Sequence, residues 1–322
     1  MAIRLAQGTA AKATRDAYGD VLVEVARDQA RVAVLTGDLR DSNRLEAFAA
    51  AYPERFFECG IAEQNMISVA AGLATCGWIP FVSSFAAFLP GRCYDQIRVL
   101  VAQPALNVKM VSTHGGITVG EDGMSAQAIE ELAMMRALAN MTVIVPADAT
   151  ETVKVVRALV SHRGPAYVRL GRAAVPVLFD DTYAFALGRA AVLRDGNDVT
   201  IIACGVMVAE ALAAAETLAA EGIDARVLNM ATIKPLDEDA LLAAARETGA
   251  LVTAEEHTIY GGLGGAVCEV TAAHHPAVVE RVGIADRFGE SGTPKQLLER
   301  YGLTAREIAS AARRAVNRKR HR

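Results

Sequence analysis

One acidic side chain is a first candidate for proton chemistry. Glu63 lies in segment 56–65, after a short apolar run and Gly60, at the predicted start of a helix. Ligands of open parallel sheets bind at the carboxyl ends of the strands, so Glu63 lies where a site is expected. An acid in the first turn of a helix can also simply complement the helix dipole. This segment alone does not decide between the two.

Two aromatic side chains could form a wall for a flat ring. Phe85 and Phe88 are three residues apart, just before the break at Pro90 and Gly91. Aromatic pairs usually belong to the core. The proline break favours a position at the rim of the fold instead.

A glycine-rich segment, 113–123, follows an apolar run and contains His114, Glu121 and Asp122. Glycine-rich loops after strands let the backbone approach a ligand closely. The segment is not a P-loop, because Gly-Lys-Ser/Thr is absent. A second glycine run, 261–265, lacks the dinucleotide-binding spacing, so close packing or a tight turn is the better interpretation.

The elements that must position these residues alternate along the chain. Apolar strands between helices predict the α/β class, with two three-layer α/β/α domains and mainly parallel sheets. The predicted strands are 32–36, 108–112, 141–145, 166–170, 199–203, 225–228, 250–254 and 278–282. The predicted helices are 64–76, 126–138, 206–221, 237–248 and 262–274. We expect one domain over 1–175, a linker over 176–188 and a second domain over 189–322.

The composition narrows the class of protein. Of 322 residues, 52% are hydrophobic and the net charge is only −4, so neither nucleic acid nor a membrane is an expected partner. The five cysteines form no CxxC pair, and we expect buried, reduced thiols in a cytoplasmic protein without a metal site. No apolar run is long enough to span a bilayer.

In this order, the segments resemble the C-terminal half of transketolase, from 13–19 to 289–294. The resemblance implies a pyrimidine-binding domain followed by a transketolase C-terminal domain. The family's pyrophosphate-binding half carries a Gly-Asp-Gly run that this sequence lacks. The chain therefore resembles the C-terminal subunit of a split transketolase. Such a subunit would pair with an N-terminal subunit, form an α2β2 heterotetramer and share thiamine diphosphate, with Mg²⁺ or Ca²⁺ in the partner.

The resemblance also implies cofactor-binding roles. Glu63 matches the glutamate that hydrogen-bonds N1′ of the aminopyrimidine ring and activates the cofactor. Phe85 and Phe88 match the aromatic wall beside that ring. Asp38 and Ile61 match positions close to the cofactor.

Substrate-binding roles follow from the same resemblance. Arg15, Ser42, His114 and Arg172 match a sugar-phosphate clamp, and Asp122 matches the aspartate that binds the α-hydroxyl of the donor ketose. His114 is also expected, with Glu63, among the catalytic residues. Guanidinium groups suit a phosphate dianion because they bind it through two hydrogen bonds.

One position departs from the family. Ala126 stands where His or Gln is usual, so a hydrogen-bonding group near the substrate is lost. The expected reaction is two-carbon ketol transfer from a ketose phosphate to an aldose phosphate, as in the pentose phosphate reactions. Ala126 leaves open a branched, deoxy or sulfonated donor.

Three other functions stay open at this stage. They are a 1-deoxyxylulose-5-phosphate synthase-like subunit, the β subunit of a 2-oxo-acid dehydrogenase, and a non-catalytic scaffold. Segments 85–88, 120–123 and 233–236 favour transketolase over the first two.

Overall fold

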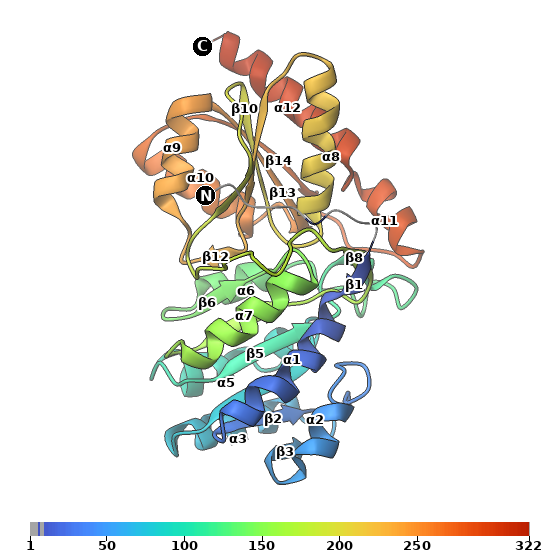
Figure 1. Ribbon diagram of the computed structural model, residues 1–322, viewed down its shortest axis with the longest axis vertical. Helices are drawn as coiled ribbons and strands as arrows, with labels where there is room; N and C mark the ends of the chain where they lie inside the picture. The colour runs from blue at the N-terminus through green and yellow to red at the C-terminus, as the bar shows by residue number, and fades with distance from the viewer. Residues whose placement is uncertain (1–5, 7–9, 322) are drawn as a thin grey trace.

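The computed structural model describes Ala6 and residues 10–321, and two sheets organise this part of the chain (Figure 1). The first sheet has seven strands in the order β12-β6-β7-β5-β4-β2-β3. Its strands are β2 (Val32–Thr36), β3 (Phe56–Glu58), β4 (Ile79–Phe85), β5 (Lys109–Thr113), β6 (Thr142–Ile144), β7 (Ala166–Arg169) and β12 (Thr232–Lys234). All pairs are parallel except β12 with β6.

Helices cover both faces of the first sheet, which is why its central strands β2, β5 and β7 are buried along their whole length. Val34 and Phe81 pack with α1 (Thr14–Asp28) and α7 (Ala149–Ser161). Their neighbours Leu35 and Val82 point to the opposite face and pack with α3 (Glu63–Thr75) and α6 (Glu131–Ala137). Shorter helical segments border this domain: α2 (Glu46–Ala51), η1 (Pro53–Arg55), α4 (Leu89–Arg92), α5 (Tyr94–Gln96), η2 (Ile97–Ala102) and η3 (Ile117–Val119).

The second sheet has five strands in the order β14-β13-β10-β11-β9, and only β9 is antiparallel to its neighbour. Its strands are β9 (Ala191–Arg194), β10 (Val199–Ala203), β11 (Ala225–Asn229), β13 (Ala250–Thr258) and β14 (Val278–Ile284). On one face lie α8 (Met207–Ala220) and α12 (Ala305–Arg320); on the other lie α9 (Glu238–Thr248) and α10 (Leu263–His274) (Figure 1). The predicted α/β class with mainly parallel sheets is confirmed.

A strand and a hydrophobic core connect the two sheets. β12 belongs to the C-terminal half of the chain but pairs with β6 of the first sheet, Thr232 opposite Ile144. One hydrophobic core runs from Val82 and Tyr167 of the first sheet to Ile202 of the second. The domains therefore pack through a common apolar interior. Near this junction, β1 (Ala11–Ala13) pairs with β8 (Ala174–Pro176), and α11 (Pro294–Tyr301) packs on η3.

The predicted helix over 126–138 is wrong in its first part. The structure has a helix only over Glu131–Ala137. Ala128 instead forms a bridge with Gly115, and the Gln127 side chain donates to the Ile117 and Glu290 carbonyls. These contacts from distant segments override the local helical pattern.

None of the described helices is both long and apolar enough to cross a membrane.

A buried carboxylate fastens the interdomain connection to both domains. Glu151, in α7, is fully buried. It accepts hydrogen bonds from the Ala147 amide at 2.7 Å, from the Tyr183 hydroxyl at 2.7 Å and from the Asn229 amide at 2.8 Å. Tyr183 lies in the connection and Asn229 in β11, so this one side chain joins three parts of the chain.

We expect Glu151→Ala to lower the free energy of unfolding by about 3 kcal/mol, because three buried donors lose their acceptor. The measurement is urea unfolding of the purified chain. Glu221→Ala is the matched control: it removes an exposed ion pair with Arg313 and should change little. Equal effects of the two substitutions would contradict this account of the connection.

Candidate active site

The candidate site residues follow strands that end at one edge of the first sheet. β2, β4, β5 and β7 are neighbours and parallel, so their carboxyl ends lie together. Asp38 follows β2, Phe85 ends β4, His114 follows β5 and Arg172 follows β7. Glu63 begins α3, five positions after the last residue of β3. The topology therefore brings these positions to the edge where ligands of parallel sheets bind.

Four planar groups form a continuous stack along this edge. The Arg92 guanidinium lies over the Phe88 ring, 4.1 Å from its centroid. Phe88 stacks on Phe85 at 5.4 Å and 23°, and Phe85 stacks on the imidazole of His114 at 3.8 Å and 25°. Arg92 also forms an ion pair with Glu63 at 2.7 Å. One chain of contacts thus joins Glu63 to His114.

Arg92 is a site residue that sequence reasoning missed. It lies in the Pro-Gly-Arg turn that was interpreted only as a break after the aromatic pair. Its Nη1 donates to Oε1 of Glu63, whose side chain is only 4% exposed. Its carbonyl also accepts from Gln64, the next residue of α3. The signal that could have revealed it is a cation next to an aromatic wall and a predicted buried acid.

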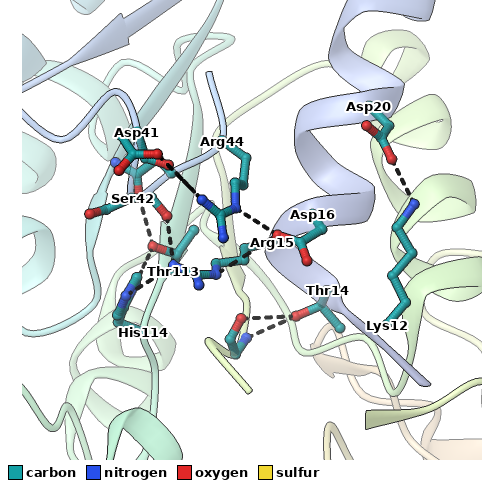
Figure 2. A network of polar contacts seen from close by, with 12 residues as sticks. Lys12, Thr14, Arg15, Asp16, Asp20, Asp41, Ser42, Arg44, Thr113 and His114 are labelled. Carbon is teal, nitrogen blue, oxygen red and sulfur yellow. Dashed lines mark hydrogen bonds and ion pairs between the residues drawn. The ribbon is translucent and has the colours of Figure 1, made fainter. Parts of the chain in front are cut away.

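His114 is held tightly in the interior. Its backbone adopts φ 59°, in the left-handed region that a residue other than glycine seldom occupies. The side chain is 3% exposed. Nδ1 lies 2.7 Å from the Thr113 hydroxyl, and Nε2 lies 3.4 Å from Nη1 of Arg15 (Figure 2).

Three arginines bring positive charge to His114. Arg15 donates to the Ser42 carbonyl at 3.1 Å, Arg44 pairs with Asp16 at 2.7 Å, and Arg172 donates to the Val119 carbonyl of the glycine-rich segment (Figure 2 shows the first two). Burial, followed by the charges of Arg15, Arg172 and Arg44, lowers the pKa of His114 to about 3. Burial and the neighbouring Arg44 also lower the pKa of Arg15. Burial is the largest cause of both shifts, and the arginine contributions show that Arg15, Arg172 and Arg44 lie close enough to His114 to act on its charge, an arrangement suited to an anion. Arg44 was not predicted from the sequence.

The remaining predicted site residues lie at the rim. Asp38 is exposed, and its amide donates to Glu58 at 2.7 Å. Gly37, just before it, packs against Glu63: a Cβ there would lie 3.7 Å from Cγ of Glu63. Ile61 is 76% exposed.

Two further predicted residues take less direct positions. Ser42 is half-buried, and its carbonyl is the atom that Arg15 contacts. Asp122 is exposed on the glycine-rich segment. The structure thus joins Glu63, Phe85, Phe88, His114 and Arg15 by direct contacts, whereas Asp38, Ile61 and Asp122 face outward.

The glycines of segment 113–123 serve packing between the domains. A Cβ on Gly115 would lie 2.3 Å from Nε of Arg169, and one on Gly116 would lie 2.1 Å from the carboxyl carbon of Glu256. At these two positions the lack of a side chain allows close packing on Arg169 and Glu256. Gly262, in the second glycine run, packs on Glu255 in the same way, which confirms close packing there.

The arrangement can hold a flat ring between an aromatic wall and a buried carboxylate, and an anion among arginines. No group of three or more His, Cys, Asp or Glu side chains suited to a metal ion occurs within the described residues. Ala126 is buried beside Gln127, and its methyl group can neither donate nor accept a hydrogen bond.

Comparisons with known proteins agree with the fold. Residues 10–177 match the transketolase pyrimidine-binding domain, and residues 188–308 match the transketolase C-terminal domain. The chain is 47% identical over 301 residues to a "Putative transketolase C-terminal section" of Methanocaldococcus jannaschii, covering 92% of this chain and 94% of that protein. It is 45% identical to a 6-deoxy-6-sulfo-D-fructose transketolase subunit of a Clostridium species, covering 95% of each. A solved structure described as "Split gene transketolase, inactive beta4 tetramer" is 49% identical, with a TM-score of 0.88 over 96% of this chain and 99% of that one.

The lowered pKa of His114 predicts a pH-dependent stability. Below its ordinary pKa of 6.5 the unfolded imidazole binds a proton, whereas the folded one stays neutral until about pH 3. Protons therefore favour the unfolded state in this window, and stability falls as the pH falls. Between pH 6.5 and 5 we expect wild type to lose about 2 kcal/mol more than His114→Gln, measured by urea unfolding at each pH. Parallel losses in the two proteins would show that His114 protonates freely in the folded state.

Proposed function

Since the chain belongs to the transketolase family, we propose that it is the C-terminal subunit of a split, thiamine-diphosphate-dependent transketolase. It would take part in moving a two-carbon ketol unit from a ketose phosphate, or a related anionic ketose, to an aldose phosphate. The observation that carries this proposal is the contact chain from Glu63 through Arg92, Phe88 and Phe85 to His114. It links an acid and an aromatic wall suited to the cofactor ring with a histidine among arginines, which is suited to an anionic substrate.

The residues present fit the aminopyrimidine ring of the cofactor. Thiamine diphosphate supplies, when bound, the nucleophilic carbon that carries the two-carbon unit. Phe85 and Phe88 would stack beside the ring, and Glu63 would hold a proton at its N1′. Because Glu63 is buried, it would exchange that proton with the ring rather than with bulk water. Asp38 and Ile61, exposed near Glu63, would contact the cofactor from the rim.

The substrate anion would bind among the arginines. The charges of Arg15 and Arg172 both lower the pKa of His114, so both guanidinium groups lie near it. A guanidinium can bind phosphate or sulfonate through two hydrogen bonds. Ser42 and His114 would complete this end of the pocket, and Asp122 would accept from the donor α-hydroxyl. The Clostridium relative is named after a sulfonated ketose, 6-deoxy-6-sulfo-D-fructose, which is consistent with a donor outside the common pentose and heptose phosphates.

A partner subunit would complete the enzyme. The sequence has no Gly-Asp-Gly run for the diphosphate and its metal ion, so an N-terminal subunit would bring the pyrophosphate-binding domain and Mg²⁺ or Ca²⁺. The M. jannaschii relative is named as a C-terminal section, and the solved split transketolase is described as inactive in its β4 form. Both names support an enzyme that needs a second kind of subunit, and the active assembly we propose is an α2β2 heterotetramer.

The test is reconstitution. We expect the chain mixed with a protein carrying the Gly-Asp-Gly run, thiamine diphosphate and Mg²⁺ to transfer a two-carbon unit between ketose and aldose phosphates, and the chain alone to transfer none. Glu63→Gln should leave partner binding intact and lower kcat at least about a hundredfold. Transfer by the chain alone would refute the split enzyme, and normal turnover of Glu63→Gln would refute the role of Glu63.

The same mixture separates the rival functions. Decarboxylation of 2-oxo acids would indicate the β subunit of a 2-oxo-acid dehydrogenase. Condensation of pyruvate with an aldose phosphate would indicate a 1-deoxyxylulose-5-phosphate synthase-like subunit. Stable association of the two chains with no transfer from any ketose, phosphorylated or sulfonated, would favour a scaffold.

Arg92 occupies the two groups that are proposed to contact the cofactor. Its guanidinium lies on Phe88 and on Glu63, the two groups that the aminopyrimidine ring would use. For the ring to bind, Arg92 has to leave both. We therefore expect Arg92→Ala to bind thiamine diphosphate about tenfold more tightly in the reconstituted complex, as one charged hydrogen bond no longer competes.

The measurement is calorimetric titration of the cofactor. Arg98→Ala, a substitution of the exposed arginine six positions later in η2, is the matched control and should leave the affinity unchanged. Weaker binding by Arg92→Ala would mean that Arg92 assists the cofactor instead of competing with it.

A further inference from the structure

A side chain of the second domain contacts the glycine-rich segment of the first. Glu256, in β13, is 6% exposed, and its Oε1 accepts from the backbone amide of Thr118 at 2.6 Å. Thr118 lies in η3, the short turn over Ile117–Val119. At Gly116, directly before this turn, φ is 81° and a Cβ would lie 2.1 Å from the carboxyl carbon of Glu256. The carboxylate can therefore approach the turn because position 116 has no side chain.

Glu256 is itself held from the first domain. Its backbone carbonyl accepts from Nη1 of Arg169 at 2.7 Å, and Arg169 is buried at the end of β7. Burial raises the pKa of the Glu256 carboxyl, and the charge of Arg169 and the hydrogen bond from the Thr118 amide oppose this rise. The side chain is thus anchored at its backbone and bonded at its carboxyl end, which keeps the turn in one place.

The turn that Glu256 contacts is also the turn that contacts Arg172. Nη1 of Arg172 donates to the carbonyl of Val119, the last residue of η3, and lies 3.5 Å from Oε2 of Glu121. Among the described residues, Nε and Nη2 of Arg172 have no hydrogen-bond partner, so both remain able to donate to a ligand. The charge of Arg172 lowers the pKa of His114, so the guanidinium lies near the candidate site. Its direction depends on where the Val119 carbonyl lies.

We infer that Glu256 is a positioning residue of the second domain, which fixes the η3 turn and, through the Val119 carbonyl, sets the direction of the Arg172 guanidinium. The residues predicted for the site all lie in the first domain. The second domain nevertheless controls one of them, and with it the binding of the substrate anion. This effect on the substrate rests on the proposed function, whereas the contact that fixes the turn does not.

Two substitutions separate the length of the side chain from its charge. Glu256→Asp keeps the charge beside Arg169 but is shorter by one methylene group, so its oxygens withdraw from the Thr118 amide. Glu256→Gln keeps the length and an oxygen for that amide but loses the charge. If Glu256 acts by its position, the shorter side chain should disturb the turn and the neutral one should not. The reverse result would mean that Glu256 only balances the charge of Arg169, and would overturn the inference.

The state of the turn can be measured in the isolated chain, by hydrogen–deuterium exchange of peptides that contain Thr118. We expect exchange about tenfold faster in Glu256→Asp than in wild type, and close to wild type in Glu256→Gln. Glu247→Ala is the matched control, because it removes an exposed acid whose ion pair with Arg226 lies within the second domain. Unchanged exchange in Glu256→Asp, or an equal rise in all three variants, would overturn the role of Glu256 at the turn.

The consequence for Arg172 is measured in the reconstituted enzyme. We expect Glu256→Asp to raise the KM for a phosphorylated donor ketose about tenfold with a smaller change in kcat, and Glu256→Gln to stay near wild type. In an Arg172→Ala background, Glu256→Asp should have no further effect on KM, because both substitutions act through one guanidinium. An additive increase would overturn the route through Arg172. If wild type turns over no ketose, the proposed function fails, while the exchange measurement still decides whether Glu256 fixes the turn.

Discussion

The buried guanidinium of Arg169 is the interaction on which the rest of the site depends. It lies at the end of β7 and pairs with Glu131 at 2.9 Å, while its two Nη atoms donate to the Ala128 and Glu256 carbonyls. Burial opposes its charge, but the Glu131 and Glu256 carboxylates raise its pKa. Removing one partner from such a buried pair costs about 3–5 kcal/mol. Arg169 thereby ties the first sheet to α6 and to β13 of the second domain.

This constraint shapes the segment that carries His114. The chain has to pass Arg169 at Gly115 and Glu256 at Gly116, and both positions lack the space for a side chain. These contacts fix the start of the segment. His114, which directly precedes Gly115, adopts φ 59°, and its imidazole stacks on Phe85. The glycines thus serve the geometry of the site indirectly, since they let the domain junction approach closely and fix the direction in which the loop leaves β5.

Much of the fold was predictable because it depends on local patterns. Alternating apolar runs gave the strands, and an acid after Gly60 marked the start of α3 at Glu63. The contacts that the prediction missed join residues far apart in sequence. Arg92 meets Glu63 across 29 positions, and Glu256 meets the amide of Thr118 across 138. The pairing of β12 with β6 is of the same kind, since nothing within segment 232–234 indicates which sheet it joins. Composition and periodicity carry no information about such partners.

The polar side chains of the proposed site limit which substrates it can select. In the proposed site Asp122 would require a hydroxyl donor from a ligand, while Arg15, His114 and Arg172 would require an anion. The side chain of Ala126 adds neither a donor nor an acceptor to this set of polar groups. We therefore expect discrimination to come from the spacing of hydroxyls and anion, because a missing partner for a buried polar group costs far more than an altered contact with a methyl group. Phosphate and sulfonate can both accept from a guanidinium, so a change from one to the other would require no change at the proposed hydroxyl-binding position, Asp122.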